Sequence, residues 1–249
     1  ALPVVLAAKK YKIPVVAHES DYTVGLANKI SSKYCKLVLT SFPETANNLK
    51  NGKYVGSPIR VSKDLPNKAA LNSYFGFKEN KPVILITGGS SGAKTINKIV
   101  RESLDDLTRL YNVIHLVGKG NLTKNIYGTS YAQFEFMDNI DYAFTLADVC
   151  VSRAGSNAVF ELASRFVPSI LIPLPKDASR GDQILNAKFF ASKGLFSILY
   201  QEDLTKQSLL YNIELTIKDK EKIRARLKNC GINDKSRLIA RILADERRR

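Results

Sequence analysis

The segment 148–174, DVCVSRAGSNAVFELASRFVPSILIPL, constrains the fold more than any other part of the 249-residue sequence. An apolar run at 149–151 leads through a short turn into an amphipathic stretch, and a second apolar run follows at 169–174. This pattern of strand, turn, helix and strand closes as a right-handed parallel β-α-β unit. We therefore predict an α/β protein with a parallel sheet, in which the turn opens at the carboxyl edge of that sheet.

Two residues of this turn, Gly155 and Ser156, stand where the loop enters the helix. Free backbone N–H groups and the positive end of the helix dipole would face the crevice there, which favours an anion. Glu161 follows on the same helix, where its carboxylate would be placed to accept hydrogen bonds from the two hydroxyls of a ribose. The alternative is that Glu161 only caps a surface helix.

A second glycine-rich turn follows the apolar run 83–86 and reads TGGSSGA. Its candidate phosphate-binding residues are Gly88, Gly89, Ser90 and Gly92. Glycine lets the backbone approach a ligand closely, and a turn that leads into a helix N-terminus is suited to a diphosphate. The turn is neither a Walker loop nor G-x-G-x-x-G, and a tight turn without a ligand would use the same residues. The presence of two such loops favours the ligand-binding interpretation.

The chain is strongly basic, with a net charge of +15, and residues 217–249 hold 12 Lys or Arg against 5 Asp or Glu. Such a surplus calls for an anionic partner. Nucleic acid is not favoured, because no RNP, zinc-finger or helix-turn-helix pattern is present and the aromatic residues are not interleaved with the basic ones. An anionic lipid surface would attract the same residues, by about 1 kcal/mol for each Lys or Arg close to the bilayer. A solvated basic face is the remaining alternative.

The sequence contains no apolar run of about eighteen residues, so no membrane-spanning helix is predicted. Its three cysteines lack metal-ligand spacing, and we expect reduced thiols, no disulfide and no metal site. The first residues show neither the basic segment nor the cleavage site of a signal peptide, and no initiator Met precedes them. We expect the chain to begin inside a fold.

His18 and Glu19 form the only adjacent His-acid pair, and they follow a predicted buried strand at 13–17. Their place at the carboxyl end of a strand makes them candidates for chemistry. The other histidine, His115, lies inside the apolar strand predicted at 113–117, which favours a buried structural role. From these residues alone, the sequence indicates an α/β protein that binds a phosphorylated nucleotide.

The polar segment 63–80 is the best candidate for a linker, since a fresh α/β pattern begins after it. We therefore expect one domain at 1–62 and a second at 81–215. The basic helical segment 216–249 is expected to pack back toward the first domain.

Seven segments, taken in order, resemble the successive motifs of the MurG family within glycosyltransferase family 28. They are HESDYTVGLANKI (18–30), SFPET (41–45), VGSPIR (55–60), GGSSGAKTIN (88–97), HLVGKG (115–120), SRAGSNAVFEL (152–162) and SRGDQILNAKFFASKG (179–194). The resemblance covers nearly the whole chain and implies the GT-B fold, in which two Rossmann-like domains face each other across a cleft. The first domain would be incomplete here. Residues 1–62 resemble only the latter part of the acceptor domain, and the family's amino-terminal glycine-rich loop has no counterpart.

The resemblance also implies roles for residues on the donor side. Gly89 and Ser90 would meet the diphosphate of the sugar nucleotide, and Arg60 would supply its countercharge. Met137 would offer backbone groups to the uracil ring. Glu161 would bind the ribose hydroxyls, in agreement with the interpretation reached from the helix pattern.

Further roles follow for the sugar and the acceptor. Gln183, with Asp182 beside it, would hold the hydroxyls of the transferred sugar. His18 and Glu19 would line the acceptor side and are the catalytic candidates in this chain, while the family's general base is expected in the missing segment. The departures from the family pattern are Ser57 and Asp21, where Asn is common, and Asp182, where His or Gln is common. The last departure bears on discrimination between N-acetylglucosamine and other sugars.

The implied activity is an inverting transfer of N-acetylglucosamine from UDP-N-acetylglucosamine to the C4 hydroxyl of undecaprenyl-pyrophosphoryl-MurNAc-pentapeptide (lipid I). The product would be lipid II for peptidoglycan synthesis, made by a peripheral protein at the cytoplasmic face of the bacterial plasma membrane. The expected partners are UDP-N-acetylglucosamine, lipid I and anionic phospholipid, without nucleic acid, metal or cofactor. Two alternatives remain open: a diacylglycerol-type lipid glycosyltransferase of the same fold, and a non-catalytic donor-binding fragment or subunit.

Overall fold

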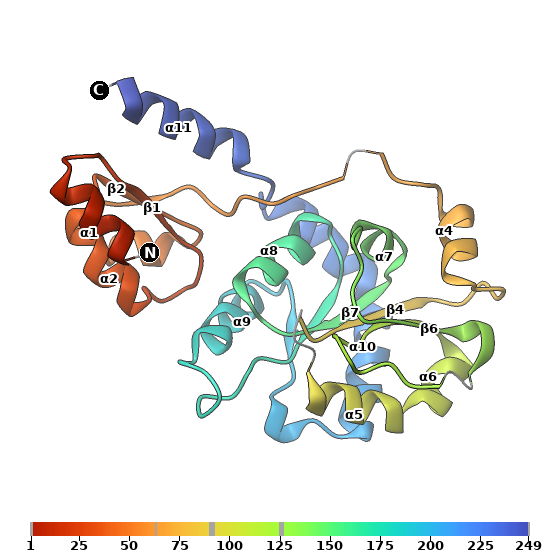
Figure 1. The fold of residues 1–249 in the computed structure, drawn as a ribbon. Coiled ribbons are helices and arrows are strands. Elements are labelled where there is room, and N and C mark those ends of the chain that lie inside the picture. The colour runs from red at the N-terminus through yellow and green to blue at the C-terminus, as the bar shows by residue number, and fades with distance from the viewer. Residues whose placement is uncertain (1, 63, 90–92, 125–126, 249) are drawn as a thin grey trace.

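The computed structural model describes residues 2–62, 64–89, 93–124 and 127–248, and within them the strands form two parallel sheets (Figure 1). The first sheet has three strands, β1 (Val16–Glu19), β2 (Leu37–Thr40) and β3 (Gly52–Tyr54), in the order β1-β2-β3. Its helices are α1 (Leu2–Lys10), α2 (Leu26–Ser31) and α3 (Pro43–Asn47), with a 3-10 turn at Ser32–Tyr34. We call this sheet and its helices, residues 2–54, the first unit.

The second sheet has six parallel strands in the order β6-β5-β4-β7-β8-β9. They are β4 (Val83–Thr87), β5 (Asn112–Leu116), β6 (Tyr131–Phe134), β7 (Val149–Ser152), β8 (Ser169–Leu171) and β9 (Ser197–Ile198). The chain runs outward from β4 to β6, and then returns to the other side of β4 to continue from β7 to β9. The strand order therefore reverses between β4 and β7, which is where open α/β sheets bind their ligands.

The predicted β-α-β unit is confirmed. It consists of β7, helix α8 (Ser156–Ser164) and β8, with Val151 paired to Ile170 in parallel register. Because β4 and β7 are adjacent, the two glycine-rich turns leave neighbouring strands at the same edge of the sheet. The structure thus brings the two turns side by side.

The side chains of the central strands alternate between two cores. Leu85 and Cys150 face one side, where they pack with helices α4, α7, α8 and α9. Ile84 and Val151 face the other, where they pack with α5, α6 and α10. The helices are α4 (Lys68–Phe75), α5 (Lys94–Glu102), α6 (Leu104–Leu110), α7 (Asp141–Leu146), α8, α9 (Asp182–Ser192) and α10 (Lys206–Asn229), with 3-10 turns at Gly128–Ser130 and Gln201–Asp203. Covered faces on both sides explain why these strands are apolar throughout. We call this sheet and its helices, residues 67–229, the second unit.

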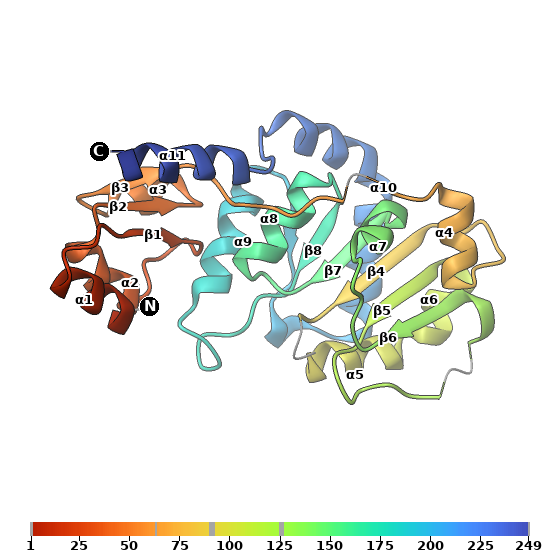
Figure 2. The same ribbon diagram turned by 45° about the horizontal axis from the view of Figure 1, so that its top comes forward.

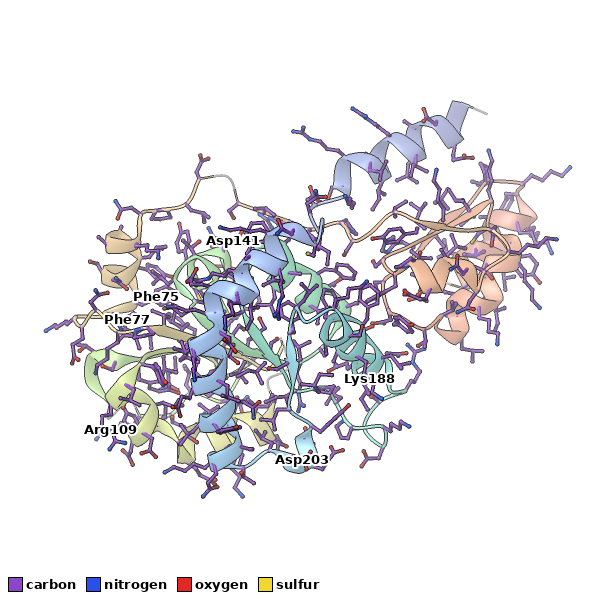
Figure 3. The ribbon with its side chains drawn as sticks, turned by 180° about the vertical axis from the view of Figure 1, so that it is seen from behind. Phe75, Phe77, Arg109, Asp141, Lys188 and Asp203 are labelled. Atoms are coloured by element: carbon purple, nitrogen blue, oxygen red, sulfur yellow. The ribbon has the colours of Figure 1, made fainter. Side chains whose placement is uncertain are left out.

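The segment expected as a linker, 63–80, contains a helix instead of an extended connection. Asn67 caps α4 by accepting a hydrogen bond from the backbone of Ala70, and Gly76 ends it in the left-handed conformation. Leu71 and Phe75, four residues apart, are buried in the second unit, and Figure 3 labels Phe75 beside Phe77. The extended connection between the units is therefore shorter than expected and lies before α4.

The boundary predicted after residue 215 falls inside α10, whose residues Leu209 and Leu227 are both buried in the second unit. Of the expected segment 216–249, it is the last helix, α11 (Ser236–Arg248), that lies along the first unit, beside β3 and α3 (Figure 2). Ile239 and Ile242 of α11 pack there with Val55 at the end of the first sheet. Among the described residues, no helix is both long and apolar enough to span a bilayer.

Candidate functional site

A pocket of about 490 Å³ opens at the carboxyl edge of the second sheet, where the strand order reverses between β4 and β7. Its lining comes from segments far apart in the sequence: the turn after β4, the segment after β6, the first half of α8 and the start of α9. The predicted residues among them are Gly88, Gly89, Met137, Gly155, Glu161 and Gln183. An adjoining cavity of about 590 Å³ is lined by Asp182 and Ser156, together with Asp21 and Arg180. The structure thus brings together most of the predicted site.

The turn after β4 needs glycine at two places for different reasons. A Cβ atom at Gly88 would stand 2.5 Å from the Cβ atom of Ala93, so the start and end of the turn approach too closely for a side chain. Gly89 has a φ of +85°, which L residues rarely adopt. Ser90 and Gly92, the other predicted members of this turn, lie outside the described residues.

Glu161 lies in the second turn of α8 and lines the pocket. The interpretation of this residue as a helix cap is wrong, because Gly155 is at the N-cap and no side chain caps the helix. Burial raises the pKa of the Glu161 carboxyl group, with Arg165 acting in the opposite sense and Asp141 in the same sense. A half-buried carboxylate in a pocket gains most from hydroxyl donors that replace its lost water.

The amide oxygen of Gln183 is engaged by the protein itself. That oxygen accepts hydrogen bonds from the backbone N–H of Ala154, at 3.3 Å, and of Leu174, at 3.1 Å. Both N–H bonds of the amide are therefore the groups that Gln183 can offer to the pocket. Asp182 is engaged differently, because its carboxylate accepts from the Thr23 hydroxyl and pairs with Arg180 at 2.7 Å.

Met137 and Arg60 have contrasting positions. Met137 is buried and lines the pocket, while its role toward the uracil ring stays a prediction. Arg60 is exposed on the connection between the units, outside the residues that line the pocket, and its carbonyl oxygen accepts a hydrogen bond from Arg165. The countercharge role of Arg60 stays a prediction.

His18 and Glu19 lie within β1 as its last two residues, not in a loop after it. The Glu19 carboxylate accepts from the backbone of Asp21 at 3.2 Å and of Gly25 at 2.9 Å, and from the amide of Asn28 at 2.9 Å. It therefore organises the following loop. Burial lowers the pKa of His18, whose Nε2 atom lies 3.4 Å from the carbonyl oxygen of Gly56. Neither residue lines the pocket, and their catalytic role stays a prediction.

Arg153 is a pocket residue that sequence reasoning missed. It is 9% exposed, and its guanidinium donates to the carbonyl oxygens of Ile172 and Pro173 and, at 2.7 Å, to the side-chain oxygen of Gln201. No carboxylate pairs with it among the described residues, and burial lowers its pKa. An arginine directly after an apolar strand was the available signal in the sequence. Its positive charge makes the electrostatic potential in the pocket more positive, which favours an anion.

A second missed group fastens the connection between the units to this region. Asp141 and Arg165 form a buried ion pair, and Figure 3 labels Asp141. Asp141 also accepts the backbone N–H of Ser62 at 2.9 Å, while Arg165 donates to the carbonyl oxygen of Arg60. Burial would raise the pKa of Asp141, but the hydrogen bonds from Arg165 and Ser62 outweigh it and hold the pKa below its usual value.

The geometry suits a ligand with an anionic centre and several hydroxyl groups. Gly88 and Gly89 of one glycine-rich turn, Gly155 of the other and the start of α8 line the pocket, where they would face an anion, while Glu161 could accept and Gln183 could donate hydrogen bonds. Among the residues described, no cluster of His, Cys, Asp and Glu has the makings of a metal site.

Family models match the chain in two places. The model of the glycosyltransferase family 28 C-terminal domain matches residues 83–242, and that of the family 28 N-terminal domain matches residues 1–40. The first match alone covers more than half of the chain.

Two curated relatives carry the name UDP-N-acetylglucosamine--N-acetylmuramyl-(pentapeptide) pyrophosphoryl-undecaprenol N-acetylglucosamine transferase. The one from Clostridium tetani (strain Massachusetts / E88) is 42% identical over 238 residues, which is 94% of this chain and 66% of the relative. The one from Clostridium botulinum (strain Hall / ATCC 3502 / NCTC 13319 / Type A) is 46% identical over 213 residues, 84% of this chain and 60% of the relative. This chain therefore spans less than two thirds of the length of either relative.

Solved structures give the same picture. MurG of Acinetobacter baumannii superposes with a TM-score of 0.74 at 26% identity, over 98% of this chain and 70% of that one. The glycotransferase of kitacinnamycin superposes with a TM-score of 0.68 at 14% identity, over 92% and 68% of the two chains, and supports the fold alone. The predicted GT-B architecture is confirmed by these matches.

Proposed function

Since the chain belongs to glycosyltransferase family 28, we propose that its pocket binds UDP-N-acetylglucosamine and forms the donor side of an inverting N-acetylglucosaminyltransferase. One observation carries the proposal. The glycine-rich turn after β4, the start of α8, Glu161 and Gln183 converge on one pocket where the strand order reverses.

In this proposal the sugar nucleotide lies across that edge of the sheet. The uracil ring is held by the backbone at Met137, and the ribose hydroxyls donate to Glu161. The diphosphate lies over the glycine-rich turns, where α8 contributes the N-terminal N–H groups beginning at Ser156. Arg60 adds a countercharge. Gln183 donates to the sugar hydroxyls, with Asp182 beside it.

The reaction is a direct displacement. The C4 hydroxyl of the acceptor sugar attacks the anomeric carbon, the bond from that carbon to the UDP oxygen breaks, and the configuration inverts. A general base takes the hydroxyl proton, and UDP leaves with the electron pair. Backbone dipoles and arginine charge stabilise the developing negative charge on the leaving group, in the way that preorganised donors do.

Calorimetric titration tests the donor site. Glu161→Ala removes the acceptor for two hydroxyls, and we expect it to weaken UDP-N-acetylglucosamine binding by about 1–3 kcal/mol. Glu102→Ala, on the last residue of α5 and outside the pocket lining, is the matched control and should leave the affinity unchanged. An unaltered affinity in Glu161→Ala would remove that residue from the site.

The acceptor we propose is lipid I, and the names of the curated relatives favour it over diacylglycerol. Since neither His18 nor Glu19 lines the pocket, we expect the 249 residues to bind the donor and to transfer it negligibly. A radiolabelled assay with lipid I and with diacylglycerol decides between acceptors, using both this chain and one extended to the length of its relatives. Transfer by the 249 residues at the rate of the longer chain would place the base in this chain, with His18 the first to mutate.

A lipid-linked acceptor also requires a membrane. We propose peripheral association with the cytoplasmic face of the plasma membrane through anionic phospholipid, supported by the net charge of +15. Vesicle co-sedimentation should increase with the anionic lipid fraction and fall as salt is raised. Binding that depends on neither variable would count against the electrostatic contact.

A further inference from the structure

Asn186 occupies a place that none of these roles uses. It lies on α9 three residues after Gln183, and it has no solvent-exposed surface (0%). A buried carboxamide offers one oxygen acceptor and two N–H donors, and each needs a partner. The partners of Asn186 come from both units.

Three hydrogen bonds occupy this carboxamide. Its oxygen accepts the backbone N–H of Tyr22 at 2.9 Å. Its nitrogen donates to the carboxylate of Asp21 at 3.0 Å and to the carbonyl oxygen of Ala154 at 3.1 Å. These partners fix which way the amide points, because a backbone N–H requires an oxygen and a carbonyl requires an N–H. Asn186 thus joins the loop 20–25 of the first unit to the turn 153–156 of the second.

The turn is held at a second point by the same helix. The backbone N–H of Ala154 donates to Gln183, so both polar backbone groups of Ala154 bind side chains of α9. Ala154 immediately precedes Gly155, which is the N-cap of α8. A shift of Ala154 therefore moves the start of the helix that carries Glu161.

We infer that Asn186 is a positioning residue that couples the loop 20–25 to the turn 153–156, and this inference rests on the proposed function. When the loop is docked, the contacts to Asp21 and Tyr22 hold the carboxamide in the orientation that fixes Ala154. When a donor orders the turn, the same carboxamide holds the loop. The coupling is reciprocal, because each event favours the arrangement that the other needs.

A simpler alternative is that Asn186 only fastens the two units together. Other contacts do that without reaching the turn. Phe42 of the first unit packs against Phe160 and Phe189 of the second, and the Thr23 hydroxyl donates to Asp182. Thr23→Val, which removes one inter-unit hydrogen bond and leaves Ala154 untouched, is therefore the matched control.

Two further variants separate the two arms of the bridge. Asn186→Asp keeps the shape and the acceptor for Tyr22, but sets an oxygen against the Asp21 carboxylate and the Ala154 carbonyl. Adding Asp21→Asn restores a hydrogen bond between position 186 and the loop 20–25 only, since the amide introduced at position 21 can donate to the carboxylate introduced at 186. The double variant should therefore dock its loop normally while the contact to Ala154 stays broken.

The experiment measures hydrogen exchange in segments 20–25 and 153–158 at pH 8, with and without UDP-N-acetylglucosamine, alongside calorimetric affinity. In the unaltered chain the donor should slow exchange in both segments.

In Asn186→Asp the donor should no longer slow exchange in 20–25, and the Kd for the donor should rise about five-fold, the loss expected for about one hydrogen bond. In the double variant donor-free exchange of 20–25 should return to normal, but the donor should still fail to slow it. In Thr23→Val donor-free exchange of 20–25 should rise, while the donor still slows it and Kd stays within about two-fold.

Slowing of 20–25 by the donor in Asn186→Asp, to the extent seen in the unaltered chain, would overturn the inference. So would loss of that effect in Thr23→Val, because simple fastening would then explain it. If the unaltered chain gives no calorimetric signal with UDP-N-acetylglucosamine, the proposed function fails. The hydrogen bonds of Asn186 are then tested by hydrogen exchange measured without a ligand. Faster exchange of both segments in Asn186→Asp would then support the bridge, and any other result would refute it.

Discussion

Lowering the pH should destabilise this protein through His115, which is fully buried on β5, the second strand from one edge of the second sheet. Its Nε2 atom lies 3.0 Å from the side-chain oxygen of Asn97, and its Nδ1 atom lies 3.0 Å from the hydroxyl of Tyr131. Asn97 donates through its nitrogen to the carbonyl oxygen of Val117, so its oxygen faces the ring and requires a proton on Nε2. Nδ1 is then the acceptor, and the neutral imidazole satisfies every contact.

Burial, with a smaller contribution from the positive charge of Arg101, lowers the pKa of His115 to about 3 from 6.5. Between pH 6.5 and about pH 3, His115 is therefore protonated in the unfolded chain but neutral in the folded chain. Protons bind preferentially to the unfolded state in this range, so the free energy of unfolding falls as the pH falls. The stability is fully present above pH 6.5 and is lost progressively down to about pH 3. At pH 5 the loss from His115 is about 2 kcal/mol, from a slope of about 1.4 kcal/mol for each pH unit below 6.5.

Urea unfolding at pH 8 and pH 5 measures this loss. His115→Gln removes the titrating group but keeps an amide that can both donate and accept, so its free energy of unfolding should change about 2 kcal/mol less between the two pH values. His18→Gln, at the other histidine, is the control for the smaller effect of a partly buried imidazole whose pKa is also lowered. An equal loss in the unaltered chain and in His115→Gln would refute the reasoning, because the sensitivity would then come from other groups.

Two further predictions concern the glycine-rich turn after β4 and the connection between the units. Gly88→Ala should raise the Kd for UDP-N-acetylglucosamine in calorimetry by about ten-fold, or about 1.4 kcal/mol, since the added methyl would lie 2.5 Å from the Cβ atom of Ala93 and force residues 88 and 93 apart. An unchanged Kd would show that this close approach does not matter for binding. Arg165→Leu should cost about 3–5 kcal/mol in urea unfolding by leaving Asp141 buried without its partner. Arg109→Leu, in an exposed pair, should cost less than about 1 kcal/mol, and equal losses in the two variants would argue against a buried charge at Asp141.

The parts of the fold that sequence predicts best are those decided by short-range pattern. The apolar runs of β4 and β7 and the turns that follow them carry their own signals, and the doubly wound sheet then places the two turns side by side. Glu161 could be predicted for the same reason, because its distance from the turn along α8 is set by helix geometry alone.

The sequence-based predictions failed at the end of β1 and in the segment 63–80, where the local sequence pattern was weak or ambiguous. The apolar run 13–17 suggested a strand that ends before His18, but the pairing to β2 continues through Glu19. In the supposed linker, the polar composition hid a helix whose signals were present: Asn67 at the N-cap and two apolar residues four apart. A cap and one apolar stripe deserve more weight than average polarity when a short helix packs on a core.

Contacts between the units lay beyond any local pattern. Tyr22 and Asn186 are 164 positions apart, and nothing in either segment announces the other. Arg153 gave a signal, as a charge after an apolar strand, but its importance depends on the burial that the fold imposes.

The carboxylate of Asp182, a departure from the family pattern, has a physical explanation in this interface. The Thr23 hydroxyl and the Arg180 guanidinium both bind it, so a hydroxyl of the first unit and a neighbouring arginine compensate its negative charge. Gln183 lines both cavities, and its oxygen is fixed by two backbone N–H groups, so its two N–H bonds are the groups it offers there. An amide locked in this way can donate to a sugar hydroxyl but cannot turn to accept from one. Under the proposed function, we therefore expect selection among sugars to depend more on the orientation of Gln183 than on the charge at position 182. That orientation depends on the same turn that Asn186 holds.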